Sequence, residues 1–306
     1  MKDEKQNQQE QAAGMGLRVR RVWTLALATT TQLVRMKMLA FLVLFCMLVV
    51  GAGFMFSVVN PEQQLALIKS VSLGALQVFS IVIGIVSTAL LLPKDMEDRT
   101  LYTILSKPVP RLEYLIGKLL GVLLLVGGGL IVMDAVLSAV IYARQDAVLA
   151  EALHALEMDR QATPEVVARL EQTVAAQGLT WNMHWAVWAI FLKATVVTTM
   201  ALLLSCIASS TLFTIVVSFC AVIIGHGEAL LREFFFHPHL SGTAERGASM
   251  VLAMVVPDLA QFDILDGVVE GQMVSWGALA DMTGIAALYV VGYLTITHLV
   301  FVEKEL

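Results

Sequence analysis

The chain has 306 residues, of which 58% are hydrophobic and 15% are charged, and its formal net charge at pH 7 is −5. Soluble domains carry about 25% charged residues, so this composition excludes an ordinary soluble domain. Because the apolar residues form runs of about 20, the length that spans a hydrocarbon core, the sequence predicts an all-α, polytopic membrane protein.

The N-terminal region divides into two parts. Residues 1–16 are polar and rich in Gln, Lys and Glu, so we predict a disordered tail, and no cleavable signal peptide is expected. In residues 17–36, arginines alternate with apolar residues around Trp23. This pattern predicts a basic amphipathic helix lying in the headgroup plane, the alternative being the positive flank of a signal anchor.

Six apolar runs predict six transmembrane helices. The fourth and fifth are separated only by residues 208–211, which predicts a tight helical hairpin. The predicted spans are, approximately, 38–59, 68–92, 114–142, 185–209, 211–231 and 276–302.

Lys and Arg concentrate on one side of these spans, in the N-terminal region, in residues 93–113 and at the C-terminal end. Cytoplasmic loops are enriched in Lys and Arg, so we predict that both termini are cytoplasmic. The even number of spans agrees with this orientation. The predicted location is the cell (inner or plasma) membrane.

Residues 93–113 carry many charges of both signs and lie between two long apolar runs. Hydrocarbon does not tolerate so many charges, so this segment is predicted to be an aqueous connector at the cytoplasmic face. Residues 96–105 contain no Gly or Pro, and Leu101, Ile104 and Leu105 share one helical face. A short surface helix is therefore expected there.

Two polar segments lie on the opposite side. Residues 143–184 predict an extracytoplasmic helical hairpin, with a first helix over residues 146–158 and a second helix capped by Thr163, started by Pro164 and stopped near Gly178. We interpret it as an acidic cap, the alternative being a substrate-binding domain. Residues 232–275 contain an apolar run at 248–256 that is too short to cross, which predicts an extracytoplasmic or re-entrant segment.

No catalytic or metal-binding motif is present. The chain lacks a phosphate-binding G-x-x-x-x-G-K-[ST] loop. Its three cysteines lie in apolar runs without metal-ligand spacing, and His226 with His237 and His239 makes a poor metal site because a proline separates the last two. We predict no metal site, no catalytic residue and no cofactor in this chain.

Charged residues within or beside the spans are the remaining candidate sites. A charge at mid-bilayer costs about 2.5–3.5 kcal/mol, so such residues tend to pair or to serve a function. The candidates are Asp134 in the third span, Lys193 in the fourth and Glu228 near the outer end of the fifth. An Asp134–Lys193 pair is one arrangement, and snorkelling of Lys193 toward the outer interface is the alternative.

Residues 97–118, EDRTLYTILSKPVPRLEYLIGK, resemble a motif of the membrane-spanning subunits of ATP-binding-cassette (ABC) type-2 exporters. The family pattern is an acidic residue, a Gly or small residue, Thr, a Leu-Leu-Ser-x-Pro-[Val/Ile]-x-Arg stretch and a Gly-Lys pair. Arg99 stands where many members have Gly. Weaker matches are Leu203-Leu204-Ser205 and the stretch from Val256 to Asp263. The layout is similar to the single-domain bacterial branch.

The resemblance implies that residues 17–36 are an elbow helix and that residues near 96–106 are a coupling helix that docks on a separate ABC ATPase. It implies a permease domain over residues 17–306, a second permease copy or paralogue as dimer partner, contact with membrane lipids, no nucleic-acid partner, and ATP bound by the partner subunit. The implied ATPase-coupling residues are Glu97, Asp98, Arg99, Thr100, Leu101, Leu105, Pro108 and Arg111.

The expected function is therefore transport without catalysis by this chain. The alternatives are an intramembrane enzyme that uses Asp134, His226 and Glu228, and a membrane scaffold without a transport role. The sequence does not identify a substrate, because look-alike architectures handle lipids, sugars, drugs and peptides.

Overall fold

The computed structural model describes residues 2–37, 40–55, 61–97, 110–158, 163–208, 210–236 and 256–303. Within these ranges the protein is helical and has no strand, which confirms the all-α prediction for this part of the chain. The elements are α1 (Lys2–Arg35), α2 (Ala40–Met55), α3 (Pro61–Glu97), α5 (Arg111–Met158), α6 (Pro164–Gln177), α7 (Trp181–Ile207), α8 (Thr211–Phe236), the 3-10 helix η2 (Ala260–Phe262), α10 (Leu265–Val269) and α11 (Trp276–Glu303).

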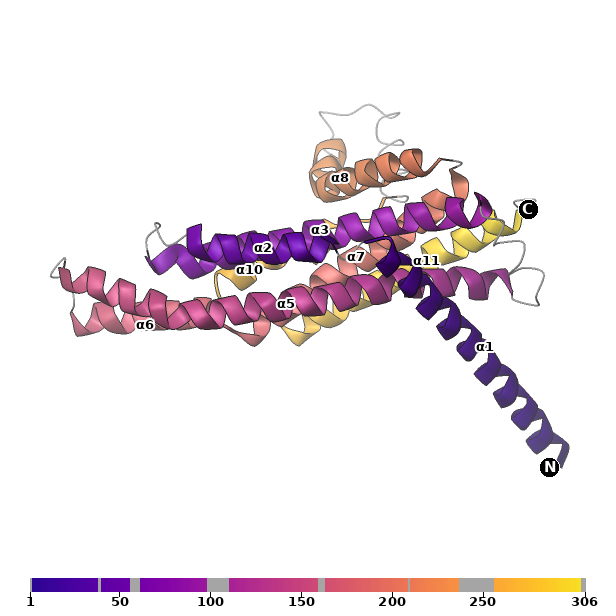
Figure 1. Ribbon diagram of the computed structural model, residues 1–306, viewed down its shortest axis with the longest axis horizontal. Coiled ribbons are helices and arrows are strands. Elements are labelled where there is room, and N and C mark those ends of the chain that lie inside the picture. Colours follow the sequence, from indigo (N-terminus) through magenta and orange to yellow (C-terminus); the bar gives the residue numbers. More distant parts are fainter. Residues whose placement is uncertain are drawn as a thin grey trace.

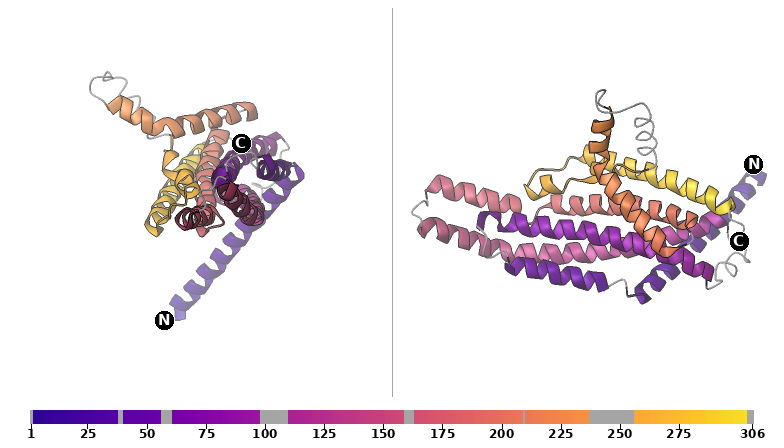
Figure 2. Two further views of the ribbon diagram at one scale, coloured as in Figure 1. Left: turned by 90° about the vertical axis from the view of Figure 1, so that its left-hand side faces the viewer. Right: turned by 90° about the horizontal axis from the view of Figure 1, so that it is seen from above.

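The helices form an elongated bundle (Figure 1). Helices α2, α3, α5, α7 and α11 run along its long axis, while α1 leaves it obliquely and α8 runs across α3 and α7 (Figures 1 and 2). The end of α3, the start of α5 and the end of α11 lie at the same end of the bundle. We call residues 97–111, which join α3 to α5, the connector, and this end of the bundle the connector end. At the opposite, hairpin end, α5 ends at Met158 and α6 begins at Pro164.

Four stretches are long and apolar enough to cross a membrane: Gln63–Leu91, Arg111–Met158, Pro164–Ile207 and Trp276–Glu303. They correspond to the second, third, fourth and sixth predicted spans. The first and fifth predicted spans coincide with shorter apolar helical stretches, Leu42–Ala52 and Thr211–Gly227, among the described residues. Over the residues that the structure describes, the protein is thus a helical membrane protein with four helices of spanning length and two shorter apolar ones.

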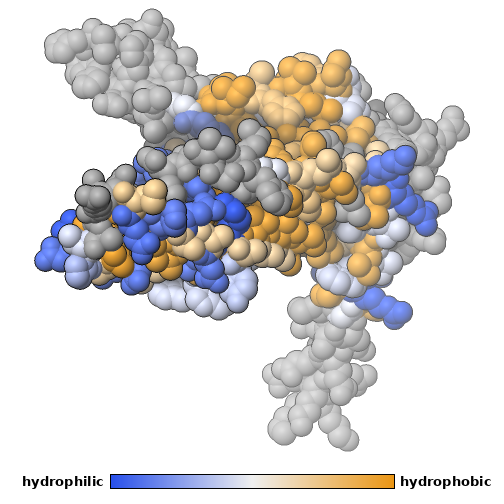
Figure 3. Space-filling model, turned by 60° about the vertical axis from the view of Figure 1, so that its left-hand side comes forward, coloured by the Kyte–Doolittle hydropathy of each residue, from blue (hydrophilic) through white to orange (hydrophobic). Residues whose placement is uncertain are grey.

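The outer surface has the polarity that a membrane requires. Figure 3 shows hydrophobic residues in a broad zone along the bundle and hydrophilic residues gathered at the hairpin end. Large apolar side chains on this surface include Met47 (69% exposed), Ile131 (72%), Ile223 (72%) and Leu288 (75%). An apolar exterior of this kind is stable in lipid and would aggregate in water.

Two helix boundaries differ from the predicted ones. Helix α1 begins at Lys2, although the sequence predicts a disordered tail over residues 1–16. The Gln, Glu, Lys and Ala residues of this stretch are good helix formers, and their helix propensity explains the difference. Helix α3 passes Pro93 and ends at Glu97. Proline has a φ compatible with a helix, but it has no N–H to donate to the carbonyl four residues earlier, so α3 passes Pro93 with one intrahelical hydrogen bond fewer.

The predicted hairpin over residues 143–184 is present, with one difference. Its second helix is α6, and the hydroxyl of Thr163 accepts a hydrogen bond from the N–H of Val166 (3.4 Å) ahead of Pro164, as predicted. Its first helix is not separate, because α5 runs unbroken to Met158. Neither Gly nor Pro interrupts residues 130–158, so nothing stops the helix at the end of the apolar run.

Helix α1 packs on the start of α5 through two glycines. The side chain of Leu25 lies over Gly117, and Thr29 and the carbonyl of Ala26 lie over Gly121. Glycines four residues apart present a flat surface on one helical face and let two helices approach closely. The hydroxyl of Thr30 donates a hydrogen bond to the carbonyl of Gly121 (2.9 Å), which fixes this crossing.

Replacing Gly121 with alanine should loosen this crossing. The added Cβ would lie 2.5 Å from the Cβ of Thr29 and 2.7 Å from the carbonyl oxygen of Ala26. Such overpacking typically costs about 1–3 kcal/mol. We expect Gly121→Ala to lower the thermal unfolding midpoint of the purified protein in detergent. Gly128→Ala is the matched control, since its Cβ would meet no atom within 4 Å; equal midpoints for the two variants would contradict the prediction.

Candidate functional site

The predicted ATPase-coupling residues lie mainly outside the described residues. Residues 98–109 are not described, which leaves Asp98, Arg99, Thr100, Leu101, Leu105 and Pro108 without a structural account. Glu97 is the last residue of α3, and Arg111 is the first residue of α5. The structure therefore defines where the connector begins, at the end of α3, and where it ends, at the start of α5.

Arg111 holds the start of α5 to the end of α11. Its Nη1 donates hydrogen bonds to the carbonyl oxygens of Phe301 (3.0 Å) and Val302 (2.8 Å), and its guanidinium lies over the Phe301 ring. The last carbonyls of a helix lack intrahelical donors and carry partial negative charge, so an arginine there is stabilising. Arg111 thus joins the connector to the last helix of the bundle.

Glu113 lies in the first turn of α5 and faces α1. It is 9% exposed, and its carboxylate is 3.8 Å from Arg21 and 4.0 Å from Arg18. Two arginines of the predicted amphipathic helix, Arg18 and Arg21, therefore form ion pairs with a buried carboxylate on α5. Helices α1, α5 and α11 are consequently connected within the first turns after the connector.

A second polar cluster lies where the segment before α11 returns to the bundle. Residues 256–275 pack against α3, α7 and α8, and Leu259 and Phe262 are fully buried. The N–H of Leu259 donates to the carbonyl of Gly225 on α8 (3.0 Å). The carboxylate of Asp258 accepts from the N–H of Ala260 (3.1 Å) and stabilises the turn into η2.

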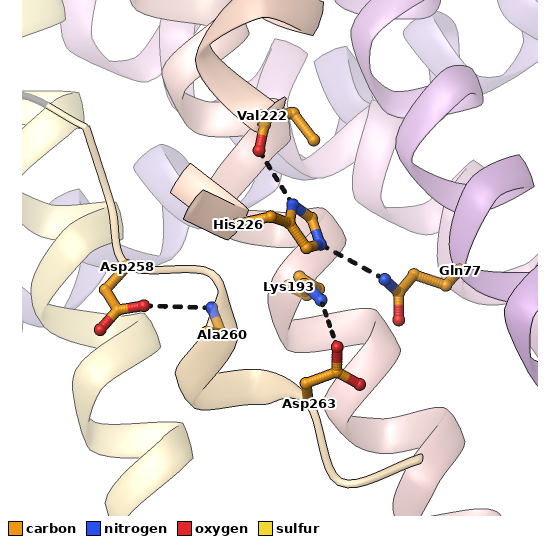
Figure 4. Close-up of polar contacts among 7 residues, drawn as sticks. All are labelled: Gln77, Lys193, Val222, His226, Asp258, Ala260 and Asp263. Carbon is orange, nitrogen blue, oxygen red and sulfur yellow. Dashed lines mark hydrogen bonds and ion pairs between the residues drawn. The ribbon is translucent and has the colours of Figure 1, made fainter. Parts of the chain in front are cut away.

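We call Gln77, Lys193, His226, Asp258 and Asp263 the polar junction (Figure 4). The side chain of Lys193 is fully buried, and its Nζ lies 3.8 Å from Oδ2 of Asp263, which is half exposed. Figure 4 shows these two side chains pointing toward each other. The alternative for Lys193, snorkelling toward the outer interface, is not observed. The ammonium group of Lys193 is buried inside the bundle, and the segment before α11 places the carboxylate of Asp263 beside it.

His226 links α8 to α3. Its Nδ1 lies 2.9 Å from the carbonyl oxygen of Val222, and its Nε2 lies 3.5 Å from Nε2 of Gln77. Because a carbonyl only accepts, Nδ1 carries the hydrogen, and Nε2 then accepts from the Gln77 amide. Both ring nitrogens are thereby engaged in positioning α8.

The Asp134–Lys193 pair, one of the two arrangements that the sequence left open, is not formed. Oδ2 of Asp134 lies 2.7 Å from Nδ1 of His184, near the start of α7. Lys193 follows His184 by about two and a half helical turns, which places it about 13 Å further along α7 and on the opposite face. Asp134 on α5 therefore meets one face of α7, and Asp263 meets the other.

The residues of the alternative enzyme hypothesis have different partners. Asp134 pairs with His184, His226 pairs with Gln77, and the side chain of Glu228 is not among those the structure describes. No group of three potential metal ligands gathers among the described residues, and His237 and His239 lie outside them.

Sequence reasoning missed His184 and Gln77. His184 lies between Trp181 and Trp185, in a stretch that reads as an aromatic interfacial anchor. Gln77 is an isolated polar residue in the second predicted span and could have been singled out on that ground. Their partners are far away in sequence, so no local spacing could have revealed the pairs.

No protein-family model and no curated protein matches this sequence.

The Lys193–Asp263 pair predicts a specific pattern of stability. Asp263→Asn leaves a buried ammonium without its carboxylate, which typically costs about 1–3 kcal/mol. We expect this variant to unfold at lower temperature than the wild type in detergent, and the double variant Lys193→Met/Asp263→Asn to recover most of the loss. Asp266→Asn, which removes an exposed carboxylate from the same segment, is the control. A double variant no more stable than Asp263→Asn would contradict the pairing.

Proposed function

We propose that this chain is the membrane-spanning permease subunit of an ABC type-2 exporter and moves its substrate with ATP hydrolysed by a separate ATPase subunit. The chain itself binds no nucleotide and catalyses no reaction in this proposal. Its task is to convert closure of the partner ATPase into a rearrangement of helices.

The observation that supports this proposal best is the position of the EDRTLYTILSKPVPR connector. It joins α3 to α5 at the connector end, where Arg111 is bonded to α11 and Glu113 to the arginines of α1. A push on the connector would therefore reach α1, α3, α5 and α11 directly. Rigid, packed helices transmit such a displacement as a body rather than by bending.

The finer architecture belongs to the same proposal. The two shorter apolar helices, α2 and α8, complete six spans, α1 includes the elbow helix, and the connector forms the coupling helix. Both termini and the connector then face the cytoplasm, the α5–α6 hairpin faces outward, and the protein resides in the cell inner membrane. Two copies or paralogues together enclose the transport path.

Co-purification tests the coupling role. Glu97→Arg/Leu101→Asp reverses a charge and places a carboxylate on the apolar face of the predicted coupling helix. We expect the full-length wild type to capture an ABC ATPase in detergent and the double variant to lose at least about tenfold of it, since tenfold corresponds to 1.4 kcal/mol. The double variant must still insert in the membrane.

The matched control is Glu157→Arg/Met158→Asp, which makes the same kinds of change on exposed residues at the hairpin end. It should capture the ATPase as the wild type does. Failure of the wild type to capture any ATPase would contradict the proposal and favour the enzyme or scaffold alternatives. Loss of capture in both double variants would contradict the assignment to the connector.

A further inference from the structure

A groove of about 400 Å³ lies between α5 and α7, on a different face of α7 from the polar junction. Its walls are mainly aromatic and aliphatic, and its only ionisable residues are Asp134 and His184. The lining residues are Gly127, Leu130, Ile131, Asp134, Trp181, His184, Trp185, Val187, Trp188 and Phe191. We call it the aromatic groove.

The groove opens on the outside of the bundle. Ile131 is 72% exposed, Trp181 79% and Trp188 40%, although all three lie on helices of spanning composition. Trp181 begins α7, and tryptophans at the end of a spanning helix lie at the headgroup level. A molecule in the aromatic groove would therefore come from the lipid phase, with its polar part near the interface.

The polar wall of the groove consists of Asp134 and His184, which contact each other. Oδ2 of Asp134 lies 2.7 Å from Nδ1 of His184, and because a carboxylate oxygen accepts, Nδ1 is the donor. Oδ1 of Asp134 is buried and has no hydrogen-bond partner among the described residues. The carboxylate is thus satisfied at one oxygen only, and a donor or a cation beside the second would lower its cost at membrane depth.

The aromatic wall suits the same ligand. Trp181 lies against the His184 ring (5.3 Å between centroids), and Trp188 lies against Phe191 (5.6 Å). Indole faces attract ammonium groups within about 6 Å, most strongly where water is excluded. A primary ammonium also donates hydrogen bonds to a carboxylate, which a trimethylammonium group does not.

We propose that the aromatic groove binds a phospholipid with a primary-amine headgroup, an ethanolamine phospholipid. The ammonium lies beside Asp134 and the tryptophan faces, and an acyl chain follows Leu130, Ile131 and Phe191 toward the middle of the membrane. This site does not depend on coupling to an ATPase and would exist in any transport, enzymatic or scaffold role.

Tryptophan quenching by brominated lipids tests the proposal, because three of the five tryptophans line the groove. The full-length protein is placed in phosphatidylcholine nanodiscs that contain the same mole fraction of dibrominated ethanolamine, choline or glycerol phospholipid. The wild type should show an apparent affinity for the ethanolamine lipid about three- to tenfold above that for the other two. Asp134→Asn should abolish this preference.

Asp281→Asn is the matched control, because Asp281 is an exposed carboxylate near the start of α11 and does not line the groove. It should keep the wild-type preference. Equal quenching by the three lipids, stronger quenching by the glycerol lipid, or a preference that survives in Asp134→Asn would overturn the proposal. Weak quenching by all three would show that protein covers the groove and would overturn it too.

Native mass spectrometry of the wild type keeps the test independent of any variant. After exposure to an equimolar mixture of ethanolamine, choline and glycerol phospholipids in detergent, the ethanolamine lipid should be retained preferentially. Retention of the three in equal amounts would count against the site, whatever the folding of Asp134→Asn.

Discussion

The requirement that charges on apolar helices be turned inward organises much of this bundle. Lys69 and Lys193 are fully buried, Lys118 is 5% exposed and Glu113 is 9% exposed. Each would be expensive in contact with lipid. Two of them attract residues from elsewhere in the chain, since Lys193 lies beside Asp263 of the returning segment and Glu113 lies beside the arginines of α1.

These buried charges have different consequences at the two ends. At the connector end, Glu113 and Arg111 tie α5 to α1 and α11, so the residues that follow the connector are firmly placed. Further along α7, Lys193 ties in the segment that leads to α11. One helical bundle therefore has a rigid attachment near the connector and a separate polar junction, which fits a protein that passes movement along its helices.

The proposed function and the proposed lipid site use different parts of α5. The start of α5 contacts α1 and α11, whereas its middle, at Asp134, meets His184 in the aromatic groove. A substitution at Asp134 therefore leaves the residues of the connector end untouched.

The sequence by itself determined the class of protein, the existence of its apolar helices and the caps of α6, because these depend on run length, helical periodicity and neighbouring residues. It also singled out Asp134 and Lys193, since an ionisable residue in an apolar run stands out wherever it folds. Only the tertiary structure decided their partners. Asp134 meets His184 and Lys193 meets Asp263 because half a helical turn separates two faces of α7, and that packing depends on contacts between segments 50 or more residues apart in sequence.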